Sequence, residues 1–349
     1  MKQVTVNASS RYDILIGKGL LSKVGTLCAK TLGLCRLCVV TDDTVDALYF
    51  DTVSRSLTEA GFDVLKFVIP HGEASKSTAS LVELLEFLAS HHMTRSDCVI
   101  TLGGGVVGDL GGFAAAVYLR GIRFVQIPTT LLAAVDSSVG GKTAVDLAAG
   151  KNLAGAFHQP SLVICDPDTL DTLPQKIFAE GCAEVIKYGV IQDRALFDRL
   201  RAGIREQAEE VIAACVEHKK NLVEQDEFDR GARQLLNLGH TVGHAIELCS
   251  AMEISHGDAV AMGMVIVTRA SVQMGLCPRK DLDSLLSLLS AEHLPTVCPF
   301  SAHELTEAAL NDKKRSGEHL TLVLPYAIGD SRLYKIPITE LCALIEKGL

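Results

Sequence analysis

The stretch that decides the fold class reads Asp97-Cys-Val-Ile-Thr-Leu102-Gly103-Gly-Gly-Val-Val-Gly-Asp109. Its apolar half is short and rich in β-branched residues, which predicts a buried strand. The glycines that follow let the backbone approach a ligand, and the free N–H groups of a helix starting there attract phosphate. Taken alone, the glycines also suit a tight strand-to-helix turn without a ligand.

The same strand–helix unit recurs on both sides of this stretch. Residues 1–16 alternate around a polar turn, which predicts a hairpin or an edge pair. Polar or glycine clusters follow the predicted strands at their carboxyl ends, where parallel sheets bind ligands. This alternation predicts a Rossmann-like parallel sheet covered by helices over residues 1–174. Further strands are predicted at Leu37–Thr41, Asp63–Ile69, Arg123–Ile127 and Ser161–Cys165, and helices at 19–30, 45–60 and 77–92.

Beyond Pro174 the pattern changes to long helical periodicity, and a strand is predicted only at Leu320–Leu324. A chain of 349 residues exceeds the size at which one core usually splits. We therefore predict an α/β plus all-α fold, with a second, mostly α-helical domain over residues 175–349. The cleft between two domains is the default place for a site. The predicted helices are 176–190, 194–225, 231–250, 257–275, 280–292 and 302–312.

Composition excludes several classes of protein. The net charge is −9 and the basic residues are dispersed, so no patch for nucleic acid is predicted. The N-terminus lacks an apolar signal core, and stretches such as Ala259–Val267 are too short to span a bilayer, so we expect a cytoplasmic protein. Eleven scattered cysteines suit reduced thiols, and Cys35 and Cys38 suit a strand core better than a redox or zinc site.

A polar stripe is predicted on the helix at 231–250. Arg233, Asn237, His240 and His244 stand at offsets 0, 4, 7 and 11, which is one face of a helix with 3.6 residues per turn. The rest of this helix is apolar, so it is predicted to be buried, where polar groups cost free energy unless paired or ligated. For one histidine a hydrogen-bonded structural role is the stronger interpretation, but the whole stripe favours a metal site.

Other residues suit the same metal. Glu184 and Lys187 lie one turn apart on a predicted helix, and His256 begins another. A carboxylate with two histidines and open positions suits a catalytic divalent ion. The residues alone leave open whether His244 is one of the ligands.

Three basic segments are weaker indications of a binding site. Lys142 and Lys151 follow glycines and suit phosphate recognition, although each alone reads as an ordinary loop lysine. The run at 311–315 reads as a solvated, charged helix end.

Together these motifs resemble the 3-dehydroquinate synthase family of sugar-phosphate cyclases. The resemblance covers nearly the whole chain, and its segments are 103–109, 128–132, 135–145, 150–152, 183–189, 236–247 and 312–314. It implies a lyase of the shikimate pathway to chorismate and the aromatic amino acids. Such an enzyme converts 3-deoxy-D-arabino-heptulosonate 7-phosphate to 3-dehydroquinate and phosphate. The implied steps are transient oxidation by NAD, β-elimination, reduction, ring opening and intramolecular aldol closure.

The resemblance implies that residues 1–174 bind NAD and that residues 175–349 bind metal and substrate. At position 71 the family usually has Asp, where this chain has His71. The implied cofactor contacts are Asp42, His71, Gly72, Glu73, Lys76, Gly104, Gly105, Val106, Val107, Gly108, Asp109, Thr129, Thr130, Lys142, Lys151, Thr169, Leu170, Asp171 and Thr172.

The resemblance also implies that zinc or cobalt is held by Glu184, His240 and His256, which makes His244 a substrate-side residue. It implies a homodimer whose partner supplies Arg120. The implied substrate contacts are Arg233 and Lys219 for the carboxylate, Lys142, Asn152, Lys314 and Arg120 for the phosphate, and Asp136, Lys187, Asn237 and His244 for the hydroxyls and ring.

Three alternatives stay open. A metal-dependent alcohol or glycerol dehydrogenase has a similar layout but does not need the cations Arg120, Lys142, Lys151, Lys187, Lys219 and Arg233. A sister cyclase would make a different carbocycle, although Arg233 with Lys219 favours a carboxylate substrate. A non-catalytic NAD-binding protein would need no metal stripe.

Overall fold

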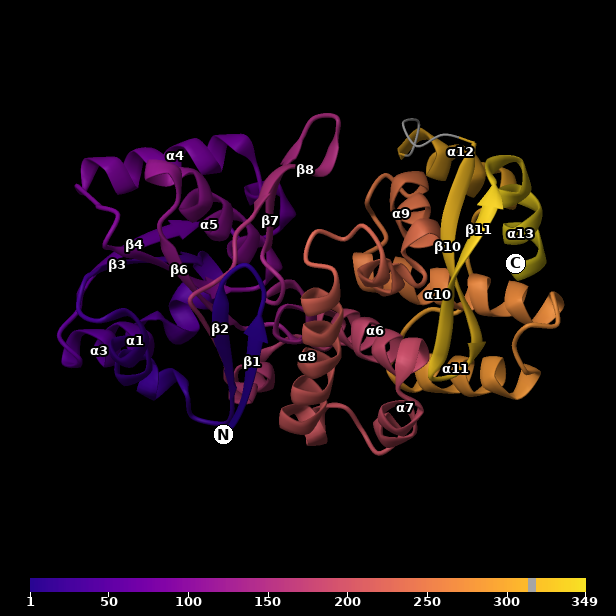
Figure 1. Ribbon diagram of the computed structural model, residues 1–349, viewed down its shortest axis with the longest axis horizontal. Helices are drawn as coiled ribbons and strands as arrows, with labels where there is room; N and C mark the ends of the chain where they lie inside the picture. The colour runs from indigo at the N-terminus through magenta and orange to yellow at the C-terminus, as the bar shows by residue number, and fades with distance from the viewer. Residues whose placement is uncertain (313–317) are drawn as a thin grey trace. The chain divides into compact units, whose positions relative to one another are not determined.

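The computed structural model describes residues 1–312 and 318–349, which form two compact units (Figure 1). Unit 1 comprises Met1–Leu173 and Ala208–Phe228, and unit 2 comprises Pro174–Gln207 and Asp229–Leu349. This division differs from the predicted boundary at residue 174 because the segment Ala208–Phe228 belongs to unit 1. Helix α8 (Ala208–Gln225) belongs to unit 1 because it packs against β1, β2 and the short π-helical turn η5 (Ala133–Ser137).

Unit 1 is built on one seven-stranded sheet. Strands β1 and β2 pair antiparallel, and all the other pairs are parallel, so the predicted Rossmann-like sheet with an N-terminal edge pair is confirmed. The spatial order is β1 (Lys2–Asn7), β2 (Arg11–Ile16), β9 (Leu162–Cys165), β6 (Arg123–Pro128), β5 (Cys98–Gly103), β3 (Arg36–Asp42) and β4 (Asp63–Ile69).

The central strands of this sheet, β3, β5, β6 and β9, are buried on both faces. Along β3, Leu37 and Val39 enter one hydrophobic core, and Cys38 and Val40 enter the other, because successive side chains point to opposite faces. Helices α1 (Val24–Leu32) and α3 (Asp51–Glu59) contribute to the first core, and α4 (Thr78–Ser90) and α5 (Gly105–Val117) to the second. Short turns α2 (Asp43–Val45) and η2 (Asp46–Phe50) lead into α3.

The cysteines of the CxxC pair are free thiols, as are the other nine. Cys38 is fully buried in the core between the sheet and its helices, and burial raises the pKa of its thiol to about 12. Such a thiol is inert at neutral pH, so the pair fits the core interpretation.

A separate hairpin carries the two lysines that were predicted to lie in loops. Lys142 begins β7 (Lys142–Leu147) and Lys151 lies in β8 (Gly150–Phe157), which pair antiparallel. Figure 1 shows this hairpin standing apart from the main sheet. Strand β7 packs on α5, where Gly112 leaves room for the side chain of Thr143. The loop prediction is therefore wrong at both lysines, because packing on α5 orders the glycine-rich segment as a ribbon.

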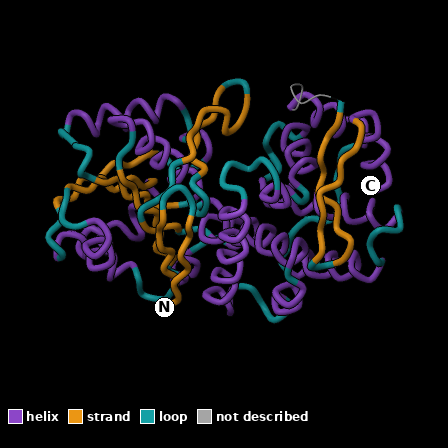
Figure 2. The backbone as a smooth tube through the Cα atoms, viewed as in Figure 1, coloured by secondary structure: helices purple, strands orange, loops and turns teal. Residues whose placement is uncertain are grey.

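Unit 2 is mostly helical, as predicted, with one two-stranded hairpin (Figure 2). Its central helix α10 packs against α6, α9, α11, α13 and β10. Strand β11 and helix α13 are additions to the predicted elements. The bounds are α6 (Gln175–Gln192), α7 (Arg194–Leu200), α9 (His240–Cys249), α10 (His256–Gln273), α11 (Arg279–Ala291), α12 (Ala302–Asp312), β10 (His319–Ala327), β11 (Asp330–Pro337) and α13 (Leu341–Gly348).

Two long predicted helices are wrong because each is broken at a glycine with positive φ. The helix predicted at 194–225 splits into α7 and α8, with Gly203 at φ +95° between them. The helix predicted at 231–250 consists of a 3-10 segment, η8 (Ala232–Asn237), and α9. Gly239 at φ +78° separates the two, and a Cβ there would lie 2.8 Å from the Val260 carbonyl oxygen. Arg233 and Asn237 therefore do not share an α-helix with the histidines.

None of the described helices combines the length and apolar character that a membrane span requires.

Candidate metal and nucleotide sites

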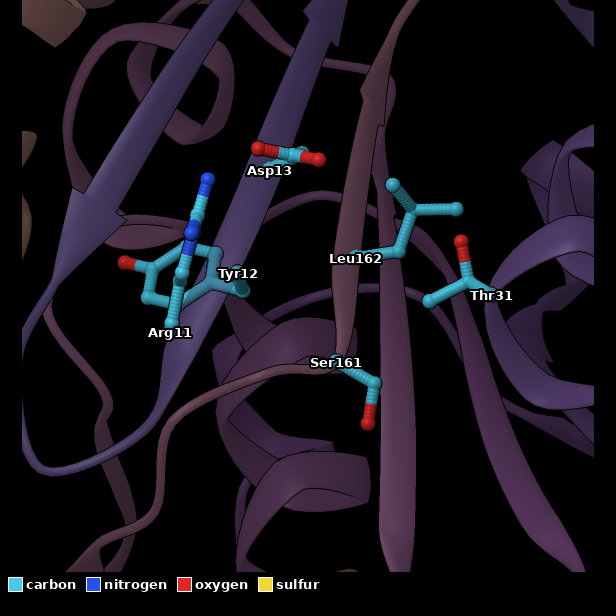
Figure 3. Close-up of a pocket in the computed structure, with 6 residues that line it drawn as sticks. All are labelled: Arg11, Tyr12, Asp13, Thr31, Ser161 and Leu162. Atoms are coloured by element: carbon cyan, nitrogen blue, oxygen red, sulfur yellow. The ribbon is translucent and has the colours of Figure 1, made fainter.

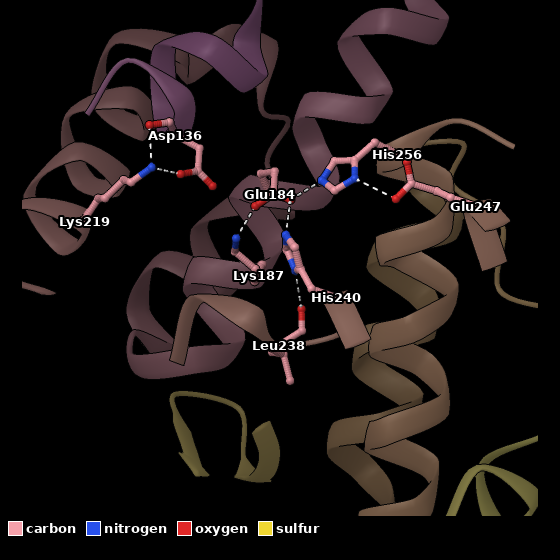
Figure 4. A network of polar contacts seen from close by, with 8 residues as sticks. All are labelled: Asp136, Glu184, Lys187, Lys219, Leu238, His240, Glu247 and His256. Carbon is pink, nitrogen blue, oxygen red and sulfur yellow. Dashed lines mark hydrogen bonds and ion pairs between the residues drawn. The ribbon is translucent and has the colours of Figure 1, made fainter. Parts of the chain in front are cut away.

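Three chemically reactive side chains converge in unit 2 from three different helices. Glu184 comes from the middle of α6, and His240 and His256 are the first residues of α9 and α10. One ligand atom of each lies within 4.8 Å of the others. The Nε2 atoms of His240 and His256 lie 3.4 and 3.5 Å from Oε1 of Glu184 (Figure 4). The structure thus brings together the three residues predicted to hold a metal.

Glycines explain how helices from distant parts of the chain come this close. A Cβ on Gly257 would lie 2.3 Å from Cα of Glu180, so only glycine lets the start of α10 touch α6. A Cβ on Gly263 would lie 2.1 Å from the carbonyl oxygen of Gly239, where α9 begins. Both ligand-bearing helix starts are therefore positioned by backbone-to-backbone packing.

The environment of Glu184 fits a divalent cation. The residue is 1% exposed, and neither carboxylate oxygen accepts a well-aligned hydrogen bond from the described residues. Lys187, one turn further along α6, forms an ion pair with it. Burial alone would raise the pKa of Glu184, but Lys187 and His240 outweigh burial and hold it well below its usual range. A buried, ionised carboxylate facing two imidazole nitrogens is a ligand set that zinc or cobalt accepts.

Both imidazoles direct Nε2 toward Glu184, because a hydrogen-bond acceptor faces the other nitrogen, Nδ1, of each ring. Nδ1 of His240 is 3.1 Å from the carbonyl oxygen of Leu238, and Nδ1 of His256 is 3.3 Å from Oε2 of Glu247. Burial, together with Lys187, lowers the pKa of His240 to about 3, so this ring is neutral, as a metal ligand must be.

His244 belongs to a second, overlapping group with Glu247 and His256, whose ligand atoms also lie within 4.8 Å of one another. Its ring centre lies 5.6 Å from that of His240. Glu247 is the residue that the sequence interpretation missed. It follows His244 by three positions, so both lie on one face of α9, and this spacing was the available signal.

In unit 1, the glycine-rich turn lies between β5 and α5, as predicted. Gly104 precedes the first turn of α5 without a side-chain cap, which leaves that turn open to an anion. A Cβ on Gly104 would lie 3.0 Å from the methyl carbon of Thr130, and the Thr129 amide donates to the carbonyl oxygen of Gly103 at 3.0 Å. The carboxyl ends of β5 and β6 are thereby joined.

A buried ion pair stabilises this edge. Nζ of Lys76 lies 2.6 Å from Oδ2 of Asp109, on α5. Burial alone would lower the pKa of Lys76, but Asp109 and Glu73 outweigh burial and raise it. The lysine therefore stays charged beside the open helix start, where it suits a phosphate group.

The remaining predicted cofactor residues lie at the same ends of neighbouring strands. Asp42 ends β3 and caps the next turn by accepting from the amides of Thr44 and Val45. After β4, Nδ1 of His71 lies 2.7 Å from Oδ1 of Asp43. Residues Thr169–Thr172 form a turn after β9, and the hydroxyl of Tyr49 donates to the carbonyl oxygen of Thr169. Only Lys142 and Lys151 stand elsewhere, on the β7–β8 hairpin.

The predicted substrate residues fall in both units. In unit 1, Lys219 on α8 pairs with Asp136 in η5 and also donates to the Asp136 carbonyl oxygen at 2.6 Å (Figure 4). Arg120 and Asn152 are exposed and have positive φ, +70° and +57°.

In unit 2, Arg233 in η8 is 2% exposed, whereas Asn237 and His244 are exposed. Lys314 lies outside the described residues.

One further pocket in unit 1 lies away from these groups. It measures about 230 Å³ and is lined by Arg11, Tyr12, Asp13, Thr31, Ser161 and Leu162 (Figure 3). These residues surround the amino ends of β2 and β9. The glycine-rich turn and the other predicted cofactor residues lie at the carboxyl ends of the strands. This pocket therefore does not lie at the edge of the sheet where the ligand is predicted to bind.

Comparisons with known proteins agree on one family. Two family models, described as the N-terminal and C-terminal parts of 3-dehydroquinate synthase, match residues 66–180 and 181–315. The chain is 42% identical to the 3-dehydroquinate synthase of Streptococcus suis, over 99% of both chains. It is 44% identical to that of Lactiplantibacillus plantarum, over 95% of this chain and 94% of the relative.

Solved structures share the fold. A 2-epi-5-epi-valiolone synthase from Streptomyces hygroscopicus, with NAD+ and Zn2+ bound, has a TM-score of 0.88 at 27% identity and covers 99% of this chain and 98% of its own. A glycerol dehydrogenase from Schizosaccharomyces pombe has a TM-score of 0.66 at 17% identity and covers 95% of this chain and 87% of its own, so it shares the fold alone. The matches to both family models and the near-full-length identity to these synthases show that the chain belongs to the 3-dehydroquinate synthase family.

Proposed function

We propose that this chain converts 3-deoxy-D-arabino-heptulosonate 7-phosphate into 3-dehydroquinate and phosphate, with NAD and one zinc or cobalt ion as cofactors. The observation that carries the proposal is the buried carboxylate of Glu184 facing Nε2 of His240 and His256, in a chain of this family. A structural neighbour that holds NAD+ and Zn2+ supports the same pair of cofactors.

The metal would be held by Glu184, His240 and His256. NAD would bind along the carboxyl edge of the sheet, with its phosphates at the start of α5 and beside Lys76. When bound, NAD supplies reversible hydride transfer, and a divalent cation supplies Lewis-acid polarisation of a hydroxyl group. The residues of the chain supply binding, orientation and charge around these groups.

The substrate would be recognised by cations and polar side chains. The guanidinium of Arg233 suits the carboxylate because it pairs with two oxygens at once, and Lys219 would assist it. Lys142, Asn152, Lys314 and Arg120 would surround the phosphate, and the substrate's own phosphate would accept the proton lost in β-elimination. Asp136, Lys187, Asn237 and His244 would contact the reacting hydroxyls and the ring.

We further propose a homodimer in the cytoplasm, in which Arg120 reaches the partner's site. Its exposed position and its left-handed backbone, at φ +70°, support a role at a surface rather than in the core of its own chain. Size measurement in solution, together with the loss of turnover in Arg120→Ala, tests this assignment.

The decisive experiment follows phosphate and NADH together during turnover of the seven-carbon sugar phosphate. We expect one phosphate released per product, NAD needed only in catalytic amounts and no accumulation of NADH. Stoichiometric NADH would identify a net dehydrogenase instead. Formation of another carbocycle from a different sugar phosphate, with no turnover of this substrate, would identify a sister cyclase.

A further inference from the structure

The imidazole of His256 lies between two buried carboxylates. Its Nε2 atom is 3.5 Å from Oε1 of Glu184, and its Nδ1 atom is 3.3 Å from Oε2 of Glu247 (Figure 4). Glu247 is 3% exposed and comes from the last turns of α9, whereas His256 begins α10. The two helices are joined by a short turn, so the contact links the end of one ligand-bearing helix to the start of the next.

This arrangement determines which ring nitrogen of His256 is available to a metal. A carboxylate is only an acceptor, so Nδ1 must carry the proton that it donates to Glu247. In the neutral ring, Nε2 then has its lone pair directed toward Glu184. The opposite tautomer would place two acceptors against each other at Nδ1 and aim an N–H at the metal position.

His240 has the same hydrogen-bond arrangement, with a different acceptor at Nδ1. Its Nδ1 atom faces the carbonyl oxygen of Leu238 at 3.1 Å, so Nε2 is again the free nitrogen. The carbonyl is neutral and belongs to the rigid turn before α9. The acceptor of His256 is the side-chain carboxylate of Glu247, so of the two acceptors it alone can be removed by substitution.

The backbone of Glu247 is fixed by two hydrogen bonds. Its carbonyl oxygen accepts from the Met252 amide at 2.8 Å and from the Ser250 hydroxyl at 3.0 Å, which closes the end of α9. Burying a carboxylate costs free energy unless it is paired, and His256 supplies such a pairing. The contact between the carboxylate and Nδ1 of His256 favours one orientation of the imidazole.

We propose that Glu247 is a positioning residue of the metal site, which orients His256 through Nδ1 and strengthens Nε2 as a ligand. The inference rests on the metal site of the proposed function. Carboxylates that accept from a ligating imidazole raise its basicity, and their loss typically lowers metal affinity about 10- to 100-fold. Glu247 thus acts on the metal through His256.

The test titrates metal-free protein with Co2+ and follows the visible absorption of the bound ion. The variants are Glu247→Gln, which can still accept a hydrogen bond but has no charge, and Glu247→Ala, which has no acceptor. Glu253→Gln is the matched control, because Glu253 is an exposed carboxylate in the turn between α9 and α10. Circular dichroism of each metal-free variant checks the fold, and Glu247→Asp replaces any variant that does not fold.

We expect Glu253→Gln to bind as the wild type does, and Glu247→Gln to lose about tenfold in affinity with the shape of the spectrum retained. Glu247→Ala should lose nearer 100-fold and change the spectrum, because the ring is free to turn. Affinities within twofold of the control in both folded Glu247 variants would overturn the proposal.

Metal stoichiometry separates the remaining outcomes. One ion per wild-type chain is expected. Two ions in the wild type and one in Glu247→Ala would make Glu247 a ligand of a second site with His244, and would overturn the positioning role. If His240→Ala loses its metal while the Glu247 variants behave as the control, only this inference fails. If His240→Ala keeps its metal, the metal site of the proposed function fails.

Discussion

At the scale of the residue, the two histidines of α9 provide the sharpest test of the site. His240 faces Glu184, whereas His244 lies in the neighbouring group with Glu247. We expect His240→Ala to lose bound metal and nearly all turnover while NAD binding survives. His244→Ala is its matched control, which should keep one metal per chain and lose turnover. Elemental analysis of the purified variants measures both, and full metal occupancy in His240→Ala would refute the ligand assignment.

Arg233 is among the largest fully buried side chains, and we propose that its guanidinium pairs with the substrate carboxylate. We expect Arg233→Ala to lower kcat/KM by about 100-fold, since losing one partner of a buried charge pair costs roughly 2–5 kcal/mol. Arg233→Lys should recover only part of this, because an ammonium group cannot pair bidentately. Steady-state kinetics on the natural substrate, with metal content checked, provides the measurement. Unchanged kinetics would contradict the carboxylate role.

At the scale of the element, the metal site depends on how closely the helices pack. A Cβ on Gly257 would lie 2.3 Å from the backbone of α6, whereas one on Gly243 would lie 3.2 Å from Ala259. We expect Gly257→Ala to weaken metal binding, although it replaces no ligand, and to destabilise the protein by about 1–3 kcal/mol through overpacking. Gly243→Ala should have a smaller effect on both. Equal metal affinities and unfolding free energies in the two variants would argue against packing as the cause.

At the scale of the whole molecule, the residues proposed to bind NAD lie in unit 1 and those proposed to bind metal lie in unit 2, so we expect loss of a metal ligand to leave NAD binding intact. Metal at 100 times its dissociation constant should add about 2.7 kcal/mol to the stability of the wild type and nothing to that of His240→Ala. NAD should stabilise both proteins alike. Thermal unfolding at fixed ligand concentrations makes the comparison, and loss of the NAD effect in His240→Ala would show that the substitution damages more than the metal site.

Local patterns in the chain were enough to predict much of this protein. Strand–glycine–helix units specify a parallel sheet, because an apolar run buried on both faces and a glycine that permits tight turns act over a few residues. The positions of β3 to β6 and β9 followed from such runs. The family motifs also predicted Glu184, His240 and His256 as one group, and the structure places their ligand atoms within 4.8 Å of one another.

Tertiary contacts decided what the local patterns could not. The helical periodicity of the sequence around His240 continues across Gly239. The helix is nevertheless interrupted at Gly239, because α9 must approach α10 backbone to backbone. The hairpin of Lys142 and Lys151 forms because it packs on α5. Glu247 acquires its contact with His256 only when two helices fold against each other. Local sequence determines where most strands and turns form, but packing between elements determines the β7–β8 hairpin and which faces and nitrogen atoms meet, because those contacts join separate elements of the chain.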